Sequence, residues 1–217
     1  MSVKLLLATF LSLSLLGCSE QTHKAKSGTY LGGEIVNPTS NFVLLRKNDR
    51  LIDSIKLDQN NRFLYKIENP QEGLYQIFHN EGQIIFIEPN DSLMLRVNTY
   101  EFDETLTFSG FGAPRNNLLV ELFLLNEHEN ELMLQDEIYQ QDPETFSKSI
   151  ALLKAEREKI LQDFLKKNEA DAYFEKIAET VVNYDFYARK EVYPMSHFGV
   201  DRVAFLESLP QSFFDYR

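Results

Sequence analysis

Residues 82–97 read GQIIFIEPNDSLMLRV, and this stretch decides the fold. Residues 84–87 are consecutively apolar, which is typical of a strand that is buried on both faces. Residues 93–97 place an apolar side chain at every second position, as a strand with one buried face does. Between them, residues 89–91 (PND) carry the proline, asparagine and aspartate of a tight turn. The stretch therefore predicts two strands joined by a turn.

The same pattern extends outward over residues 28–112. Turn residues recur at intervals of about ten residues, which is the spacing of an all-β sandwich or barrel. The connections are too short for crossovers, so we expect antiparallel pairing. Further strands are expected at residues 63–67, where Phe63, Tyr65 and Ile67 alternate with Leu64 and Lys66, and around Leu106 and Phe108. The turn signals lie at residues 37–38, 48–49, 58–61, 70–73, 80–82 and 89–91.

After Pro114 the apolar period changes to that of amphipathic helices. Glu129 interrupts the first apolar stripe, and Arg157 is the one polar residue on the second. Residues 142–144 (DPE) supply an N-cap, a proline at the first position and an acid in the first turn. Pro194 is expected to end the third helix. The three stripes are Leu118, Leu122, Leu125 and Leu132; Phe146, Ile150, Leu153, Ile160 and Phe164; and Phe174, Ile177, Val181, Tyr184 and Ala188.

The sequence thus predicts an α+β protein with two parts. An N-terminal antiparallel β-sandwich of seven to eight strands occupies residues 28–113, and an α-helical region of three to four helices occupies residues 114–217. Residues 209–217 (LPQSFFDYR) have the pattern of the start of a fourth helix. This helix would be too short to bury its own aromatic side chains. We expect either a lost downstream half or a separate chain to supply the missing surface there.

The N-terminal segment predicts a bacterial lipoprotein. Residues 1–17 form a signal peptide whose apolar run, residues 5–16, is too short to span a bilayer as a helix. The run ends in LLGC, a lipobox that places Cys18 for acylation. The alternative is an ordinary secretory signal with a chance cysteine, and the bulk of Leu16 favours that alternative slightly. Residues 18–27 would be the lipidated tether, and several acyl chains on one residue anchor a protein stably.

The location predicted from this segment is the cell envelope, with the folded part facing the periplasm. The serine directly after Cys18 favours outer-membrane sorting. The lipid membrane is then a partner through acylated Cys18, and the helical C-terminal region is a possible site for a protein partner.

Composition excludes several classes of function. The chain has 22 Lys and Arg against 33 Asp and Glu, a formal net charge of −11, which argues against a general nucleic-acid binder. A single cysteine excludes an internal disulfide framework, a CxxC redox pair and a multi-cysteine zinc site. Once Cys18 is acylated no free thiol is left for chemistry.

The strand-rich part resembles a known domain. It is similar to the N-terminal domain of unknown function in Bacteroidetes periplasmic lipoproteins of the thiol-disulfide interchange type (TlpA and ResA). That family carries its CxxC on a thioredoxin domain behind a helical linker, and this chain has no counterpart to it, so no catalytic residue carries over. Asn61 and Asn90 stand where the family has glycine, a mild change because asparagine tolerates positive φ. The matching pieces are residues 33–35, 57–63, 73–77, 85–93 and 108–112, with Asn116 behind them.

Candidate chemical groups are few. His128 and Glu131 lie one helical turn apart and could share a metal, but a bundle metal site needs such ligands on several helices, so a solvated polar face is the better interpretation. His79 and His197 suit surface or capping positions. No Gly-x-Ser-x-Gly elbow is present. A glycosidase carboxylate pair cannot be recognised without geometry. The sequence predicts no catalytic residue, no cofactor and no bound metal.

The resulting hypothesis is a non-catalytic binding or interaction module on a membrane-anchored lipoprotein. One alternative is a truncated or partial thiol-disulfide oxidoreductase. Another is a glycan- or peptide-binding subunit of an uptake system, with a groove lined by strand aromatics or a peptide added at an open sheet edge. Those aromatics, more simply sandwich core, are Tyr30, Phe42, Tyr75 and Phe86.

Overall fold

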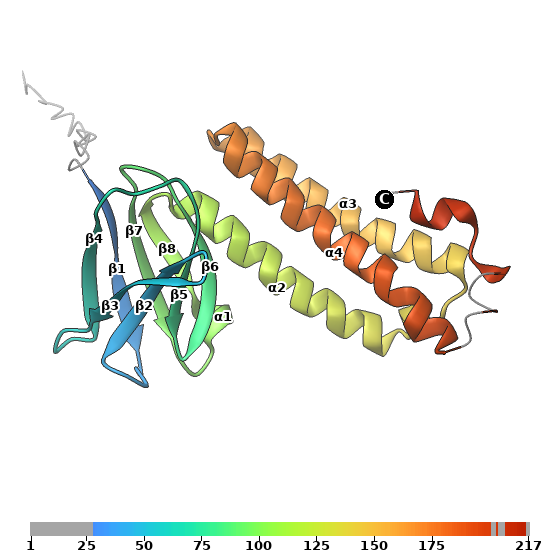
Figure 1. Cartoon of the computed structure of the whole chain (residues 1–217), viewed down its shortest axis with the longest axis horizontal. Helices are drawn as coiled ribbons and strands as arrows, with labels where there is room; N and C mark the ends of the chain where they lie inside the picture. Colours follow the sequence, from blue (N-terminus) through green and yellow to red (C-terminus); the bar gives the residue numbers. More distant parts are fainter. Residues whose placement is uncertain (1–27, 201–202, 204–206, 216–217) are drawn as a thin grey trace, which may run out of the picture.

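The protein is a β-sandwich from which a bundle of long helices extends to one side (Figure 1). The computed structural model describes residues 28–200, 203 and 207–215. The strands come first in the chain and the long helices follow. An α+β fold with an N-terminal β-sandwich is therefore confirmed.

Eight strands form two four-stranded sheets in the described part of the chain. The first sheet has the order β4-β1-β7-β8, and the second has the order β3-β2-β5-β6. Their bounds are β1 Thr29–Val36, β2 Phe42–Lys47, β3 Arg50–Lys56, β4 Arg62–Ile67, β5 Gly73–His79, β6 Glu81–Ile87, β7 Ser92–Asn98 and β8 Thr107–Phe111.

One strand pair departs from the predicted antiparallel pairing. β1 and β7 run parallel, from the pair Tyr30 and Ser92 to the pair Val36 and Asn98. The expectation rested on short connections between consecutive strands, but β1 and β7 are not consecutive. The chain passes through the second sheet between them, which gives it the length for a parallel return.

The core lies between the two sheets and is built from side chains at every second strand position. Leu31, Leu45, Ile85 and Leu93 are fully buried there. Ile85 and Phe86 point to opposite faces of β6, and both are fully buried, because helices cover the outer face of this strand at Phe86. The apolar run at residues 84–87 is thus a strand with two buried faces over part of its length, as predicted.

Asparagines close most of the turns between strands. In the described residues, positive φ angles at non-glycine positions fall mainly on asparagine, including Asn61 at 59° and Asn90 at 75°. The side-chain amide of asparagine bonds to nearby backbone groups, which lowers the cost of this conformation. The expected tolerance of asparagine at these two positions is confirmed.

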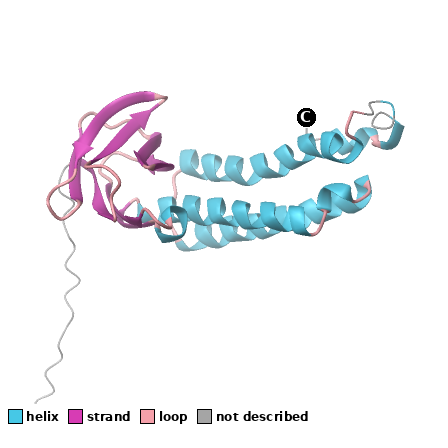
Figure 2. Cartoon of the chain, turned by 90° about the horizontal axis from the view of Figure 1, so that it is seen from below, coloured by secondary structure: helices cyan, strands magenta, loops and turns pink. Residues whose placement is uncertain are grey.

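Three long helices form the bundle: α2 (Ala113–Gln135), α3 (Pro143–Lys167) and α4 (Ala172–Phe198). Asp142 caps α3 by accepting hydrogen bonds from the backbone N–H groups of Glu144 and Thr145, both at 3.1 Å, so the predicted helix start is confirmed. The shorter elements are α1 (Phe102–Thr105) and the 3₁₀ turns η1 (Ile138–Gln140) and η2 (Gln211–Phe214). Figure 2 shows the helices leaving the sandwich as an elongated arm.

The prediction that Pro194 ends the third helix is wrong, because α4 continues to Phe198 with the proline inside it. Residues beyond the proline are held by a ring contact within α4 and by a tertiary contact to η1. The His197 ring stacks on Tyr193, with the ring centres 5.0 Å apart, and its Nδ1 lies 3.1 Å from the Tyr139 carbonyl oxygen. These contacts offset the hydrogen bond that the proline removes.

The C-terminal segment docks on its own chain, contrary to the expectation of an unfinished apolar surface. It forms the turn η2 in place of a fourth helix, and Phe213 is 3% exposed. The Phe213 ring packs on those of Phe146 and Tyr193, and the Lys190 ammonium lies 4.7 Å from its centre. Tyr216 lies outside the described residues.

Candidate functional site

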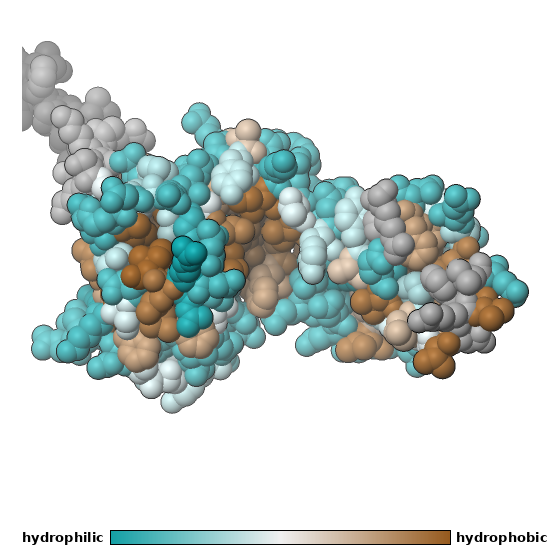
Figure 3. All heavy atoms as spheres, viewed as in Figure 1, coloured by the Kyte–Doolittle hydropathy of each residue, from teal (hydrophilic) through white to brown (hydrophobic). Residues whose placement is uncertain are grey.

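A groove lies between the sandwich and the helical arm. Its cavity volume is about 590 Å³. One wall is the β5–β6 edge of the second sheet, the floor is α2, and the opposite wall is α4. Figure 3 shows the hollow, lined mainly by apolar residues. The lining residues are Leu74, Gly82, Gln83, Ile84, Leu119, Leu122, Phe123, Asn126, Ile177, Val181, Tyr184 and Asp185.

The groove exposes large apolar side chains that an isolated soluble domain normally buries. Leu74 is 40% exposed, Ile84 is 45% exposed and Phe123 is 38% exposed. These residues come from β5, β6 and α2, so they line one continuous recess from two sides. A contiguous apolar surface of this kind is characteristic of binding sites.

The backbone of β6 supplies the groove with hydrogen-bonding groups. β6 is the last strand of its sheet and, among the described residues, pairs only with β5. At Phe86 the Asn116 side chain satisfies both edge groups, because its oxygen accepts from the Phe86 N–H and its NH₂ donates to the Phe86 carbonyl, each at 2.8 Å. Outward-facing groups recur every second residue along an antiparallel edge, so those of Ile84 and Gly82 face the same side. The Ile84 carbonyl accepts from the Gln83 side chain at 3.0 Å.

A buried charge network lies at the polar end of the groove, beneath Asn126 and Asp185. Arg157 and Arg189 both bind Glu129, at 2.5 Å and 2.6 Å for the closest N–O pairs. Arg157 also pairs with Asp185 and donates to the Asn126 side chain at 3.0 Å. The network joins α2, α3 and α4.

Arg157 keeps its positive charge inside this network because carboxylates of opposite charge lie next to it. Burial lowers the pKa of Arg157, but the hydrogen bond to Glu129 and the charges of Asp185 and Glu129 outweigh it and leave the pKa raised. Asp185 is therefore paired with the positively charged guanidinium of Arg157.

Carboxylates gather at one end of the groove, beside Gly82 and Asn126. We call Glu81, Asp103, Glu104 and Glu127 the Glu127 cluster. Burial raises the pKa of the Glu127 carboxyl, and the charges of Asp103 and Glu104 raise it further. Burial likewise raises the pKa of Asp103, with a contribution from Glu81. Every charge that contributes to these two shifts is a carboxylate.

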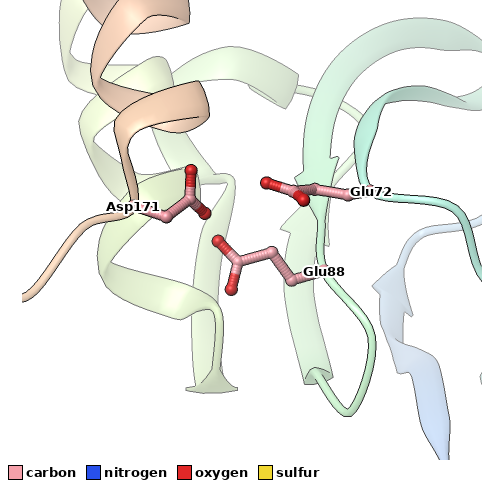
Figure 4. A group of neighbouring side chains, drawn as sticks. All are labelled: Glu72, Glu88 and Asp171. Atoms are coloured by element: carbon pink, nitrogen blue, oxygen red, sulfur yellow. The ribbon is translucent and has the colours of Figure 1, made fainter.

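A second group of carboxylates, Glu72, Glu88 and Asp171, lies at the other end of the β6 edge (Figure 4). We call it the Glu88 cluster. Each residue offers one oxygen, and these oxygens lie within 4.8 Å of one another. Arg115 lies alongside, 3.2 Å from Glu88 and 2.7 Å from Asp91.

Within the Glu88 cluster, Glu88 and Asp171 shift each other's pKa in opposite directions. Burial raises the pKa of Glu88 to about 7, and a hydrogen bond to Asp171 adds to the shift. That same hydrogen bond lowers the pKa of Asp171. Three carboxylates are a donor set that a hard cation accepts.

The residues singled out from the sequence do not meet in one site. His128 is exposed on α2, consistent with a solvated polar face. His79 is buried rather than at the surface, and its Nε2 accepts from the Thr39 N–H in the β1–β2 loop at 3.2 Å. The site residue Cys18 lies outside the described residues.

The strand aromatics are divided between core and surface. Tyr75 and Phe86 are buried in the core, whereas Phe42 is 38% exposed. Tyr30 is half-buried. None of these four aromatics lines the groove, which is formed chiefly by aliphatic residues and Phe123.

Sequence reasoning missed both the groove and the buried network. A signal for the network was present, because Glu129 and Arg157 interrupt two apolar stripes and carry opposite charges. Both are 1% exposed and bind each other. The groove gave no signal, since its walls come from distant parts of the chain.

Comparisons with known proteins do not assign this chain to a family. No protein-family model matches the chain, and no curated protein matches it. A solved structure of a DUF3823 family protein from Bacteroides ovatus has 13% sequence identity and a TM-score of 0.25. The match covers 33% of this chain and 43% of that chain, which is too weak to carry an argument. No helix in the described part of the chain is long and apolar enough to cross a membrane. The resemblance to thiol-disulfide interchange lipoproteins stays a prediction.

Proposed function

We propose that this protein is a membrane-anchored lipoprotein of the cell envelope, facing the periplasm, and that it acts by binding a partner in the groove between its sandwich and its helices. The observation that carries the proposal is the groove itself. It combines exposed aliphatic side chains with a sheet edge, and its one lining carboxylate, Asp185, is already paired with Arg157. Such a site favours binding over chemistry.

The lipobox supports the anchoring part of the proposal. Cys18 would carry the acyl chains, and the tether would keep the start of the sandwich, at Gly28, within about 30 Å of the membrane surface. The resemblance of the strand-rich part to lipoprotein domains supports the same location. The acidic surface argues against nucleic acid as the partner.

The anchor is tested by replacing Cys18 with Ser and fractionating cells. We expect the wild-type chain in the membrane fraction after high-salt and carbonate washes, and the C18S chain in the soluble periplasmic fraction. The reason is that one residue carries all of the proposed lipid. A C18S chain that stays with the washed membranes would contradict the anchor.

The groove is tested with the neutral apolar dye Nile red on mature C18S protein, which carries no lipid. We expect saturable fluorescence enhancement and about a tenfold weaker Kd for Phe123→Glu, corresponding to ~1.4 kcal/mol. Leu152→Glu is the matched control, because Leu152 is 74% exposed on α3 and does not line the groove.

The control variant should bind the dye within twofold of wild type. Equal loss in both variants, or no loss in Phe123→Glu, would show that the groove is not an accessible apolar site. Circular dichroism on each variant verifies that the fold is retained.

A further inference from the structure

We propose that one acyl chain on Cys18 occupies the groove of its own molecule while the lipid is outside a bilayer, so that insertion of the lipid into the membrane frees the groove for its partner. This inference rests on the proposed function and adds a means of regulation to the same site. Three features support it: the apolar walls of the groove, the place where the described chain begins, and the charge of the tether.

The groove suits a hydrocarbon chain because its polar side chains are already paired within the protein. Gln83 donates to the Ile84 carbonyl at 3.0 Å, and Asp185 is paired with Arg157. The Asn126 side-chain oxygen accepts a hydrogen bond from Arg157 at 3.0 Å. The rest of the lining is mainly aliphatic (Figure 3). A hydrocarbon chain would therefore cover the exposed aliphatic side chains and leave these polar side chains paired.

The edge of β6 favours the same kind of occupant. The Asn116 side chain takes both edge groups of Phe86, and the Gln83 side chain takes the Ile84 carbonyl. A polypeptide strand would have to displace these side chains to pair with the edge. A hydrocarbon chain forms no hydrogen bonds, so it can lie against this wall without displacing them.

The described chain begins close to one end of the groove. Thr29 accepts a hydrogen bond from the Asn90 backbone N–H at 2.8 Å. Four residues before Asn90, Phe86 pairs across the sheet with Leu74, which lines the groove. At the rise of a strand, and with about 5 Å between strands, Leu74 lies within about 20 Å of Asn90. The tether reaches about 30 Å when extended, so it is long enough to bring Cys18 to the groove.

The charge of the tether matches the carboxylates beside which it would lie. It carries Lys24 and Lys26 against one acid, Glu20, although the whole chain has a net charge of −11. The Glu88 cluster lies at this end of the groove, because Glu72 directly precedes β5 and Glu88 directly follows β6. The oxygens of this cluster lie within 4.8 Å of one another. Two ammonium groups beside them would lower the mutual repulsion of the carboxylates.

The groove and the bilayer would compete for the same acyl chain. A group joined to its site by a short flexible linker has an effective concentration on the order of millimolar, so the groove can hold the lipid in water. A bilayer takes up all chains of the lipid together, and several chains on one residue anchor stably. Anchoring would therefore empty the groove, and a free groove would belong to the membrane-bound form.

The single cysteine of the chain allows a hydrocarbon chain to be attached chemically at the right position. Mature protein with an unmodified Cys18 is treated with N-hexadecylmaleimide or, as the matched control, with N-ethylmaleimide. We expect the hexadecyl adduct to bind Nile red at least tenfold more weakly than the ethyl adduct and to have a Tm several degrees higher, because the linked chain fills the groove. Equal dye binding and equal Tm in the two adducts would overturn the inference.

Sedimentation at several protein concentrations tests whether the chain lies in the groove of its own molecule. We expect the hexadecyl adduct to be a monomer whose weakened dye binding does not depend on protein concentration. Micelles, or dimers that form as the concentration rises, would overturn the inference, because the hydrocarbon chain would then be covered by other molecules.

The variant Phe123→Glu tests whether the groove is the place that the linked chain occupies. We expect the hexadecyl group to raise the Tm of wild-type protein and of the control Leu152→Glu, but to leave the Tm of Phe123→Glu unchanged. The reason is that a charge on the floor of the groove opposes an apolar occupant. An equal rise in all three proteins would place the chain elsewhere and overturn the inference.

The position of the tether is tested with the double variant Lys24→Gln and Lys26→Gln. We expect its hexadecyl adduct to bind Nile red about threefold more tightly than the wild-type adduct at low salt, with a smaller difference at high salt, because the linked chain leaves the groove more often. Lys148→Gln with Lys159→Gln on α3 is the matched control and should change dye binding less than twofold. Equal changes in both would overturn the placement of the tether beside the Glu88 cluster.

Dye binding by C18S protein separates this inference from the proposed function. Nile red bound equally by C18S protein and by the hexadecyl adduct would leave a binding groove that the lipid does not cover. Absence of dye binding in C18S protein would remove the binding function itself.

Discussion

At the scale of single residues, the buried Glu129 shows how a charge is accommodated inside a helical bundle. It is 1% exposed and accepts hydrogen bonds from two arginines on neighbouring helices. A buried carboxylate without such partners would lose more hydration energy than the fold gains. The sequence already carries a sign of this pairing, because Glu129 and Arg157 have opposite charges and each lies on an apolar stripe. Which charge meets which, however, depends on the packing of the helices.

Replacing Glu129 with Gln should therefore destabilise the fold by about 3–5 kcal/mol, because Arg189 loses the carboxylate that it pairs with and Arg157 keeps only Asp185. Urea unfolding followed by circular dichroism measures the change. Glu131→Gln is the matched control, since Glu131 is exposed on the same helix, and it should stay within about 0.5 kcal/mol. A Glu129→Gln variant as stable as the control would show that the network does not hold the three helices together.

At the scale of elements, the sequence predicts what local physics determines. Turn asparagines, alternating strands and the Asp142 cap are local features, and each lies where the sequence predicts it. The parallel pairing of β1 with β7, the passage of α4 through Pro194 and the docking of Phe213 are tertiary outcomes. In these cases contacts between distant residues outweigh the local preference. The fold class was therefore predictable, and the strand pairing was not.

The groove illustrates the same limit at the level of the site. Its three walls come from residues 74–84, 119–126 and 177–185. Each segment is apolar in the sequence and would suit an ordinary core. These side chains face each other across a groove that is open to solvent because the helices leave the sandwich at an angle.

At the scale of the whole molecule, the net charge of −11 is not spread evenly. Carboxylates gather where the sandwich meets the helical arm, at the Glu127 cluster and the Glu88 cluster. The Glu88 cluster also links the two parts, since Asp171 is the N-cap of α4 whereas Glu72 and Glu88 flank strands of the sandwich. We therefore expect the stability of this junction to depend on pH.

The sign of this sensitivity follows from Glu88. Its pKa rises from an ordinary value of 4.5 to about 7 in the folded protein, first because of burial and second because of its hydrogen bond to Asp171. The folded state thus favours the protonated form. The stability that this group contributes is complete below about pH 4.5 and is lost as the pH rises through about 7. The lowered pKa of Asp171 acts in the opposite direction, but only at more acidic pH, where that carboxylate begins to be protonated.

We therefore expect the Tm of wild-type protein to fall between pH 5 and pH 8 by more than the Tm of Glu88→Gln. The glutamine amide can donate to Asp171 at every pH in this range, so it removes the titration while keeping the hydrogen bond. Glu121→Gln on the exposed side of α2 is the matched control and should retain the wild-type slope. Thermal unfolding at half-unit pH steps gives all three curves. Parallel curves for wild type and Glu88→Gln would mean that the proton between Glu88 and Asp171 does not couple the sandwich to the helical arm.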